Sequence, residues 1–293
     1  MKRLLVLMLL VPTTVLRAEI VISDDLGRNL ILQVPARRIV SLAPHLSELL
    51  FAAGAGATLV GTAAYSDFPE KVKTVPRIGD SNAIDIERVV ALKPDVVLAW
   101  RSGNPPGIIT KLEQLGMRVF VTEPTTMEAI ADQIESLGRI AGTEDTAAKA
   151  ASQLRSDIAA LRHKYQNRRP VSVFFQVWHS PLMTVNGKQV ISEVIHLCGG
   201  RNIFANLKVL IPRVSLESVL AANPEAIVTA SDQPPAKALA EWSSWKQLRA
   251  VNDGNLLVIP PDDISRPTPR LIIGARLLCE QLDRIRRVDV EKH

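Results

Sequence analysis

Cysteines and aromatic residues are scarce in this sequence, and the motifs of the common enzyme classes are missing. Only two of the 293 residues are cysteines, and 4% are aromatic. The chain has no glycine-rich phosphate loop, no GxSxG nucleophile elbow and no HExxH motif, and two cysteines do not make a zinc site. We therefore expect no catalysis, no catalytic cofactor and no bound metal, with an exported α/β enzyme as the alternative from another class.

A strong charge of one sign is also absent once the N-terminus is set aside. The formal net charge is +5, and Lys2, Arg3 and Arg17 contribute three of these charges, which leaves +2 for the rest of the chain. No cluster of lysine or arginine is interleaved with aromatic residues. A nucleic-acid partner is therefore not expected, since such proteins present a concentrated basic surface.

The first 18 residues have the pattern of a secretory signal peptide. A basic start, Met1-Lys2-Arg3, precedes the apolar run 4–11, Pro12 interrupts the run, and Ala18 offers a cleavage point. The run is too short to span a bilayer, and a buried N-terminal helix is the alternative. No cysteine follows it for lipid attachment, and no later run is long and apolar enough to span a membrane. We expect a soluble protein exported to the periplasm.

The two cysteines, Cys198 and Cys279, form an even pair. In an oxidising compartment such a pair favours a disulfide. Both lie in apolar surroundings, VIHLCGG and ARLLCEQL, so two buried free thiols are the alternative. A catalytic thiol is disfavoured because no basic residue marks either cysteine as activated.

The N-terminal half alternates short apolar strands with helical segments. Val96–Trp100 (VVLAW) is apolar throughout, as expected of a strand covered on both faces of a parallel sheet. The other predicted strands are 38–42, 58–61 and 118–122, and the predicted helices are 47–53, 86–92 and 111–115. Strand–helix–strand units at this spacing indicate a parallel α/β sheet, and we assign residues 19–124 to this lobe.

The middle of the chain contains no strand candidate. Apolar residues recur at helical spacing between 127 and 161, although Gly142-Thr143 can interrupt the pattern. We assign residues 125–166 to a long helical connector that limits hinge motion. Strands and helices then alternate again in a C-terminal lobe, residues 167–293. Its predicted strands are 171–177, 226–229 and 256–259, and its predicted helices are 190–197, 216–222 and 269–284.

An internal repeat relates the two lobes. Residues 84–100 read IDIERVVALKPDVVLAW and residues 214–230 read VSLESVLAANPEAIVTA. Each contains an acidic residue after an apolar one, a helix face, a polar-proline-acidic turn and a strand. Two similar lobes joined by a connector enclose a cleft, and clefts between domains are where small ligands bind.

Candidate ligand-binding residues lie at predicted strand ends. Tyr65, Trp100 and Trp178 follow or end strands, where ligands of α/β sheets bind, and suit stacking on a large flat ligand. Asp262 and Arg266 lie in a proline-rich loop after the last strand, with hydrogen-bonding groups near the cleft mouth. Core packing and a solvated loop are the alternatives.

His45 and His179 each follow a predicted strand, in loops that we expect to face the cleft. Either is an ordinary loop histidine or, alternatively, a ligand for a metal such as cobalt.

Glu87 and Glu217 occupy matching places in the repeat. Each begins a predicted helix, where a carboxylate is stabilised by the helix dipole, and this alone explains its position. Matching carboxylates on two lobes also suit docking onto a two-fold symmetric partner that presents arginines.

Several segments together carry a family resemblance: RIVSLAPHLSELLFAAG, AAYSDFPEKV, IDIERVVALKPDVVLAWRSGN, EVIHLCGGRNIF, VSLESVLAANPEAIV, RPTPRLI and ARLLCEQL. They run through nearly the whole chain after residue 37. The sequence resembles the solute-binding proteins of ABC importers in which a rigid helix joins two α/β lobes, and within them it is most similar to the cobalamin binders.

The resemblance implies a monomeric periplasmic carrier that delivers cobalamin to an ABC permease dimer. It implies cobalamin contacts for Pro44, Tyr65, Trp100, Asp262 and Arg266. It also implies that Cys198 and Cys279 form a disulfide, and that Glu87 and Glu217 pair with permease arginines.

Departures from the cobalamin binders keep a second cargo open. Those proteins have tryptophans where Ser81 aligns and near Ile211, and Trp178 is the residue that can compensate here. Residues 19–35 add a predicted β-hairpin of a kind usual in siderophore and haem binders. The alternative is the same scaffold carrying a ferric siderophore, haem or another metal chelate, although Phe68 stands where haem binders place a tyrosine.

Overall fold

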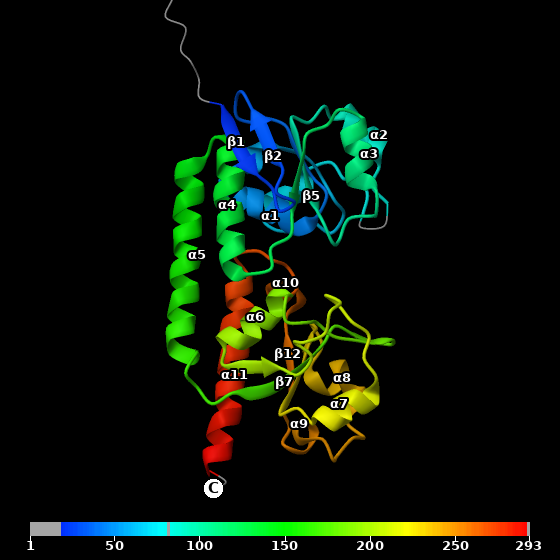
Figure 1. The fold of residues 1–293 in the computed structure, drawn as a ribbon, viewed down its shortest axis with the longest axis vertical. Coiled ribbons are helices and arrows are strands. Elements are labelled where there is room, and N and C mark those ends of the chain that lie inside the picture. The colour runs from blue at the N-terminus through cyan, green and yellow to red at the C-terminus, as the bar shows by residue number, and fades with distance from the viewer. Residues whose placement is uncertain (1–18, 81–82, 292–293) are drawn as a thin grey trace, which may run out of the picture.

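The computed structural model describes residues 19–80 and 83–291, which fold into two α/β lobes flanked by long helices (Figure 1). The predicted signal peptide, residues 1–18, and Ser81 lie outside the described residues. Among the helices in those two ranges, none is long and apolar enough to cross a membrane. Each lobe contains a four-stranded parallel sheet, as the strand–helix alternation predicts.

The N-terminal lobe is built on a sheet with the strand order β4-β3-β5-β6. Its strands are β3 (Ile39–Ser41), β4 (Leu59–Thr62), β5 (Val96–Trp100) and β6 (Val119–Thr122). They are connected by α1 (Pro44–Ala52), α2 (Ile86–Ala91), α3 (Ile108–Gln114) and the 3-10 turns Gly56–Thr58 and Glu70–Thr74. The expected N-terminal hairpin is present as β1 (Ile20–Ser23) and β2 (Asn29–Leu32), which pair antiparallel.

The C-terminal lobe has the strand order β10-β7-β11-β12. Its strands are β7 (Val171–Gln176), β10 (Gly200–Asn202), β11 (Ala226–Ala230) and β12 (Leu256–Ile259), beside a small hairpin of β8 (Trp178–His179) and β9 (Leu182–Met183). Its helices are α6 (Val190–Leu197), α7 (Leu216–Ala222), α8 (Pro235–Ala238), the 3-10 turn Ala240–Trp242, α9 (Arg249–Asn252), α10 (Pro261–Ile264) and α11 (Leu271–Glu291).

The internal repeat predicted from sequence is reproduced in the backbone of both lobes. The residues before the two matching prolines, Lys93 and Asn223, both adopt left-handed conformations, with φ of +46° and +42°. The acidic residues after the two prolines each accept a hydrogen bond from a backbone N–H. Asp95 Oδ2 accepts a hydrogen bond from Arg38 N at 2.9 Å, and Glu225 Oε2 accepts one from Ser172 N at 2.8 Å. Each carboxylate thus anchors the start of the neighbouring central strand.

The predicted connector is two antiparallel helices, α4 (Met127–Ala141) and α5 (Glu144–Tyr165), rather than one continuous helix. Gly142 separates them with φ of +72°, a conformation that favours glycine. Gly138 lets them approach closely, because a Cβ there would lie 2.3 Å from the Ala147 side chain. Both helices contact α1 of the first lobe and α6 of the second, so they brace the lobes together (Figure 1).

The predicted pairing of Cys198 with Cys279 is present, with an S–S distance of 2.04 Å between residues 81 positions apart. It joins the end of α6 to α11, and both cysteines are fully buried. The side chain of Arg286 supports the same corner, because its Nη2 donates to the carbonyls of Cys198 and Gly199 at 2.6 and 3.0 Å.

Candidate functional site

A cavity of about 420 Å³ lies where the carboxyl ends of the two sheets face each other. Trp100 at the end of β5 and Ala230 at the end of β11 both line it. These two residues occupy matching places in the repeat, so the two lobes present equivalent strand ends to one space. Ligands of open α/β sheets bind outside the carboxyl ends of the strands, where the strand order reverses. The position of the cavity therefore marks it as the candidate ligand site.

The Trp100 indole is held in place by its own loop. The Asn104 side chain accepts a hydrogen bond from Trp100 N at 2.6 Å and donates to the Leu42 carbonyl at 2.8 Å, so it ties the end of β5 to the segment after β3. Gly103 packs directly against the ring, because a Cβ there would lie 1.9 Å from an indole carbon. The indole is thus a preorganised, partly exposed surface on the N-terminal wall.

His45 lies beneath Trp100 rather than in a cleft-facing loop. It is the second residue of α1, its side chain is 3% exposed, and its ring meets the indole edge-on at 4.9 Å between centroids. Burial lowers the pKa of the imidazole to about 3, with a further contribution from the charge of Arg266, so the ring is neutral. Its Nε2 has no hydrogen-bond partner within the described chain.

His179 is exposed and belongs to the short strand β8, whereas a loop position after the preceding strand was expected. The expectation that both histidines lie in loops facing the cleft is therefore wrong for His45, which the start of α1 carries into the core. Clusters of three or more metal-ligating side chains are absent from the described part of the chain.

Two ion pairs connect the lobes beside the cavity. Arg266 Nη1 lies 2.6 Å from Asp67 Oδ1, and Arg270 binds the Glu48 carboxylate through two hydrogen bonds of 2.9 and 2.8 Å. Asp262 also contacts both arginines, and it lies in α10 rather than in the loop expected from sequence. Each pair joins the segment before α11 to the N-terminal lobe.

The electrostatics of these pairs follow from burial and charge. Burial disfavours the ionised form of Asp67, but the Arg266 guanidinium outweighs it and holds the pKa of Asp67 below its usual range. The Glu48 carboxylate, which is 4% exposed, raises the pKa of Arg270. Sequence reasoning missed Glu48, Asp67 and Arg270, because pairing between residues so distant in sequence has no local signal.

A carboxyl group on α6 joins the C-terminal lobe to the connecting helices. Glu193 accepts a hydrogen bond from the backbone N–H of Met127 at the start of α4. Burial raises the pKa of Glu193 to about 7, and the neighbouring Glu128 carboxylate adds to the effect. Arg162 of α5 pairs with Glu128 at 2.7 Å. The junction therefore joins α6 to both connecting helices.

The other predicted ligand contacts do not line the cavity. Pro44 is the partly buried first residue of α1, and Tyr65 is 75% exposed near the cross-lobe pair, since its carbonyl accepts from Arg266 Nη2 at 3.3 Å. β7 ends at Gln176, so Trp178 lies in the β8–β9 hairpin instead of at the end of β7. Its side chain is 56% exposed. The structure therefore brings Trp100 alone of these residues into the cavity lining.

An aliphatic segment, Val209, Leu210 and Ile211, supplies much of the opposite wall. Val209 and Ile211 remain 62% and 39% exposed, although both are strongly apolar. An exposed apolar patch next to a cavity marks a binding surface. The sequence pattern gave no signal for this segment, because it belongs to no helix or strand.

Glu87 and Glu217 are exposed in the first turns of α2 and α7. The preceding residues cap these helices alike: the side chains of Asp85 and Ser215 accept hydrogen bonds from the backbone N–H three residues on, at 2.9 and 3.2 Å. Hydrogen bonds from its own backbone N–H and from the Ser215 hydroxyl hold the pKa of Glu217 below its usual range. Both helices lie on the side of the molecule away from α5 (Figure 1).

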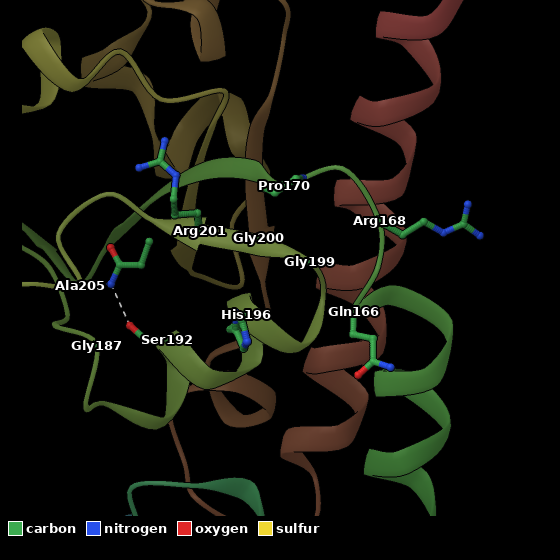
Figure 2. A pocket seen from close by; sticks show the side chains of 11 residues that line it. Gln166, Arg168, Pro170, Gly187, Ser192, His196, Gly199, Gly200, Arg201 and Ala205 are labelled. Atoms are coloured by element: carbon green, nitrogen blue, oxygen red, sulfur yellow. Dashed lines mark hydrogen bonds between the residues drawn. The ribbon is translucent and has the colours of Figure 1, made fainter.

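A second cavity, of about 430 Å³, lies on the outer face of the C-terminal lobe beside β10. Figure 2 shows that the side chains of Arg168 and Arg201 on its rim extend in different directions, away from His196 at its centre. Two polar residues of the cavity wall are hydrogen-bonded to each other, because the Ser192 hydroxyl accepts from the Asn202 amide at 2.8 Å. This cavity therefore lacks the convergent polar groups of a ligand site.

Comparisons with known proteins agree with this two-lobe architecture. The chain is 37% identical to the vitamin B12-binding protein of Vibrio cholerae over 252 residues, which is 85% of this chain and 90% of that protein. It is 38% identical to the vitamin B12-binding protein of Photorhabdus laumondii over 247 residues, 84% of this chain and 88% of the relative.

Solved structures give the same fold. The crystal structure of the periplasmic vitamin B12-binding protein BtuF of Vibrio cholerae matches with a TM-score of 0.79, at 37% identity over 86% of this chain and 98% of that chain. A periplasmic heme-binding protein from Pseudomonas aeruginosa matches with a TM-score of 0.72, at 26% identity over 83% and 91%. The family model for periplasmic binding proteins matches residues 39–262. The chain belongs to the periplasmic binding protein family.

Proposed function

We propose that this protein is a periplasmic, monomeric and non-catalytic carrier that captures cobalamin between its lobes and delivers it to an ABC importer in the inner membrane. The observation that carries the proposal is the Trp100 indole, held at a cavity where the carboxyl ends of two parallel sheets meet. A fixed indole facing an aliphatic wall suits a large, flat, partly apolar ligand such as a corrin ring.

The remaining contacts would come from the rim of the cleft. Pro44 and Tyr65 would extend the apolar contact from the N-terminal lobe, and Trp178 would do so from the β8–β9 hairpin. Asp262 and Arg266 would hydrogen-bond the amide side chains of the corrin ring. The names of the curated relatives, which are vitamin B12-binding proteins at 37–38% identity, support this cargo over haem or a siderophore.

Titration of the purified protein with cyanocobalamin tests the proposal. We expect saturable binding with a stoichiometry of one, measured by calorimetry, together with quenching of tryptophan fluorescence because Trp100 lies in the cavity lining. Haem and a ferric hydroxamate siderophore serve as comparison ligands. Absence of cyanocobalamin binding at tens of micromolar, with tight binding of either comparison ligand, would transfer the cargo assignment to that ligand.

Two substitutions test the role of Trp100, one by removing the indole and one by displacing it. Trp100→Ala is expected to weaken cyanocobalamin binding about 30-fold or more, the usual effect of truncating a central aromatic contact. Gly103→Ala keeps the indole but places a methyl group where the ring now lies, so we expect an intermediate loss of affinity. Calorimetric dissociation constants measure both, and circular dichroism checks the fold. Unchanged affinity in both variants would contradict the proposed position of the ligand.

A further inference from the structure

The walls of the cavity between the lobes carry one fixed charge of each sign. Among the described residues that line it, Lys188 is the only one with a cationic side chain and Glu123 the only one with an anionic side chain. Glu123 belongs to the N-terminal wall, where its carboxylate accepts hydrogen bonds from the backbone N–H and hydroxyl of Ser102 at 2.8 and 2.9 Å. The Glu123 carboxylate is therefore already hydrogen-bonded within the N-terminal wall.

Lys188 has an exposed side chain, and its ammonium group forms no hydrogen bond or ion pair with the described part of the chain. The arginines beside the cleft differ in this respect, because Arg266 and Arg270 are bound by Asp67 and Glu48. Among the described residues that line the cavity, Lys188 is thus the one with a cationic side chain, and no ion pair occupies it.

The surroundings of Lys188 add to its positive potential. Gln189, the N-cap of α6, separates it from that helix, and the first helical residues, Val190 and Ile191, line the same cavity. The N-terminal end of a helix carries a partial positive charge. Val209, Leu210 and Ile211 in the same lining carry no acceptor side chain, so an anionic group beside this wall would meet a cation and a helix end.

We propose that Lys188 binds the phosphodiester of the cobalamin nucleotide loop and so makes the site selective for complete corrinoids. The phosphodiester is the anionic group of that ligand, and its side chains are otherwise neutral amides. Cobinamide keeps the corrin ring and lacks the nucleotide loop, so it would lose this contact while keeping the stacking on Trp100. This inference rests on the proposed function and identifies which part of the ligand faces α6.

The test compares two ligands and three proteins by calorimetry. We expect the wild-type protein to bind cyanocobalamin about tenfold more tightly than dicyanocobinamide, the size of effect typical of a charge-assisted hydrogen bond. Lys188→Gln should lose this tenfold for cyanocobalamin and bind dicyanocobinamide as before. Lys149→Gln, a matched control on an exposed lysine of α5 outside the cavity lining, should leave both affinities unchanged.

Salt provides a second measurement. Raising sodium chloride from 50 to 500 mM should weaken cyanocobalamin binding by the wild type more than by Lys188→Gln, since screening acts on the ion pair. An equal loss for both ligands in Lys188→Gln would overturn the proposal and indicate a contact between the lobes instead. Equal binding of both ligands by the wild type would overturn it while leaving cobalamin as cargo, whereas binding of neither would overturn the proposed function as well.

Discussion

Cells that carry Glu87→Ala together with Glu217→Ala are expected to lose cobalamin uptake by tenfold or more, while the purified double variant keeps its affinity for cyanocobalamin. Both carboxylates are exposed at matching first-turn positions of α2 and α7, one on each lobe. They lie outside the cavity lining, so a contribution to ligand binding is not expected. Removing an exposed first-turn carboxylate takes away only a weak, solvent-screened interaction with the helix dipole, which leaves the protein folded.

A matched control separates docking from a general loss of surface charge. Glu144→Ala with Asp145→Ala removes two exposed first-turn carboxylates from α5, on the other side of the molecule. This control should support normal uptake of radiolabelled cyanocobalamin. Uptake by the Glu87→Ala, Glu217→Ala cells equal to that of the control cells would contradict the docking role, as would a weakened affinity in the purified variant.

Replacing both cysteines, Cys198→Ala with Cys279→Ala, is expected to destabilise the protein by about 4–5 kcal/mol, because the bond closes a long loop. The two cysteines are 81 positions apart and fully buried. For a protein of this size, such a loss lowers the midpoint of thermal unfolding by roughly 10–15 °C. Circular dichroism melting and urea unfolding measure both quantities.

Reduction of the wild-type protein provides the comparison for that variant. Unfolding in the presence of dithiothreitol should reproduce most of the shift, since the same covalent link is then absent without any change in side-chain packing. A shift of only a few degrees in both experiments would mean that Arg286 and the apolar contacts of α6 and α11 hold this corner without the disulfide.

The strands were predictable because their chemistry is local. Val96–Trp100 was expected and found with the same bounds, since four of its five residues are fully buried and therefore all apolar. α3 begins at Ile108, earlier than expected, because it has no side-chain cap that the sequence could reveal. β7 ends at Gln176, whose buried amide accepts a hydrogen bond from Trp242 Nε1 at 2.7 Å, a long-range contact without a sequence signal.

The candidate site was predictable only where a residue ends a strand. Trp100 follows from its place at the end of an apolar run. The pairing of Glu48 with Arg270 does not, because Glu48 looks like a solvent-facing residue of a short helix until the fold brings α11 beside it. The expected loop position of His45 was wrong because the helix already begins at Pro44, after only two residues that follow β3.

The helical hairpin of α4 and α5 also bears on how quickly cargo is exchanged. Because both helices pack against both lobes, they oppose a wide hinge opening between the lobes. The residence time of a bound molecule is the reciprocal of its dissociation rate constant. Differences in affinity between related sites lie mostly in that rate constant. In the proposed role, the importer shortens the residence time by binding the empty carrier more favourably than the loaded one.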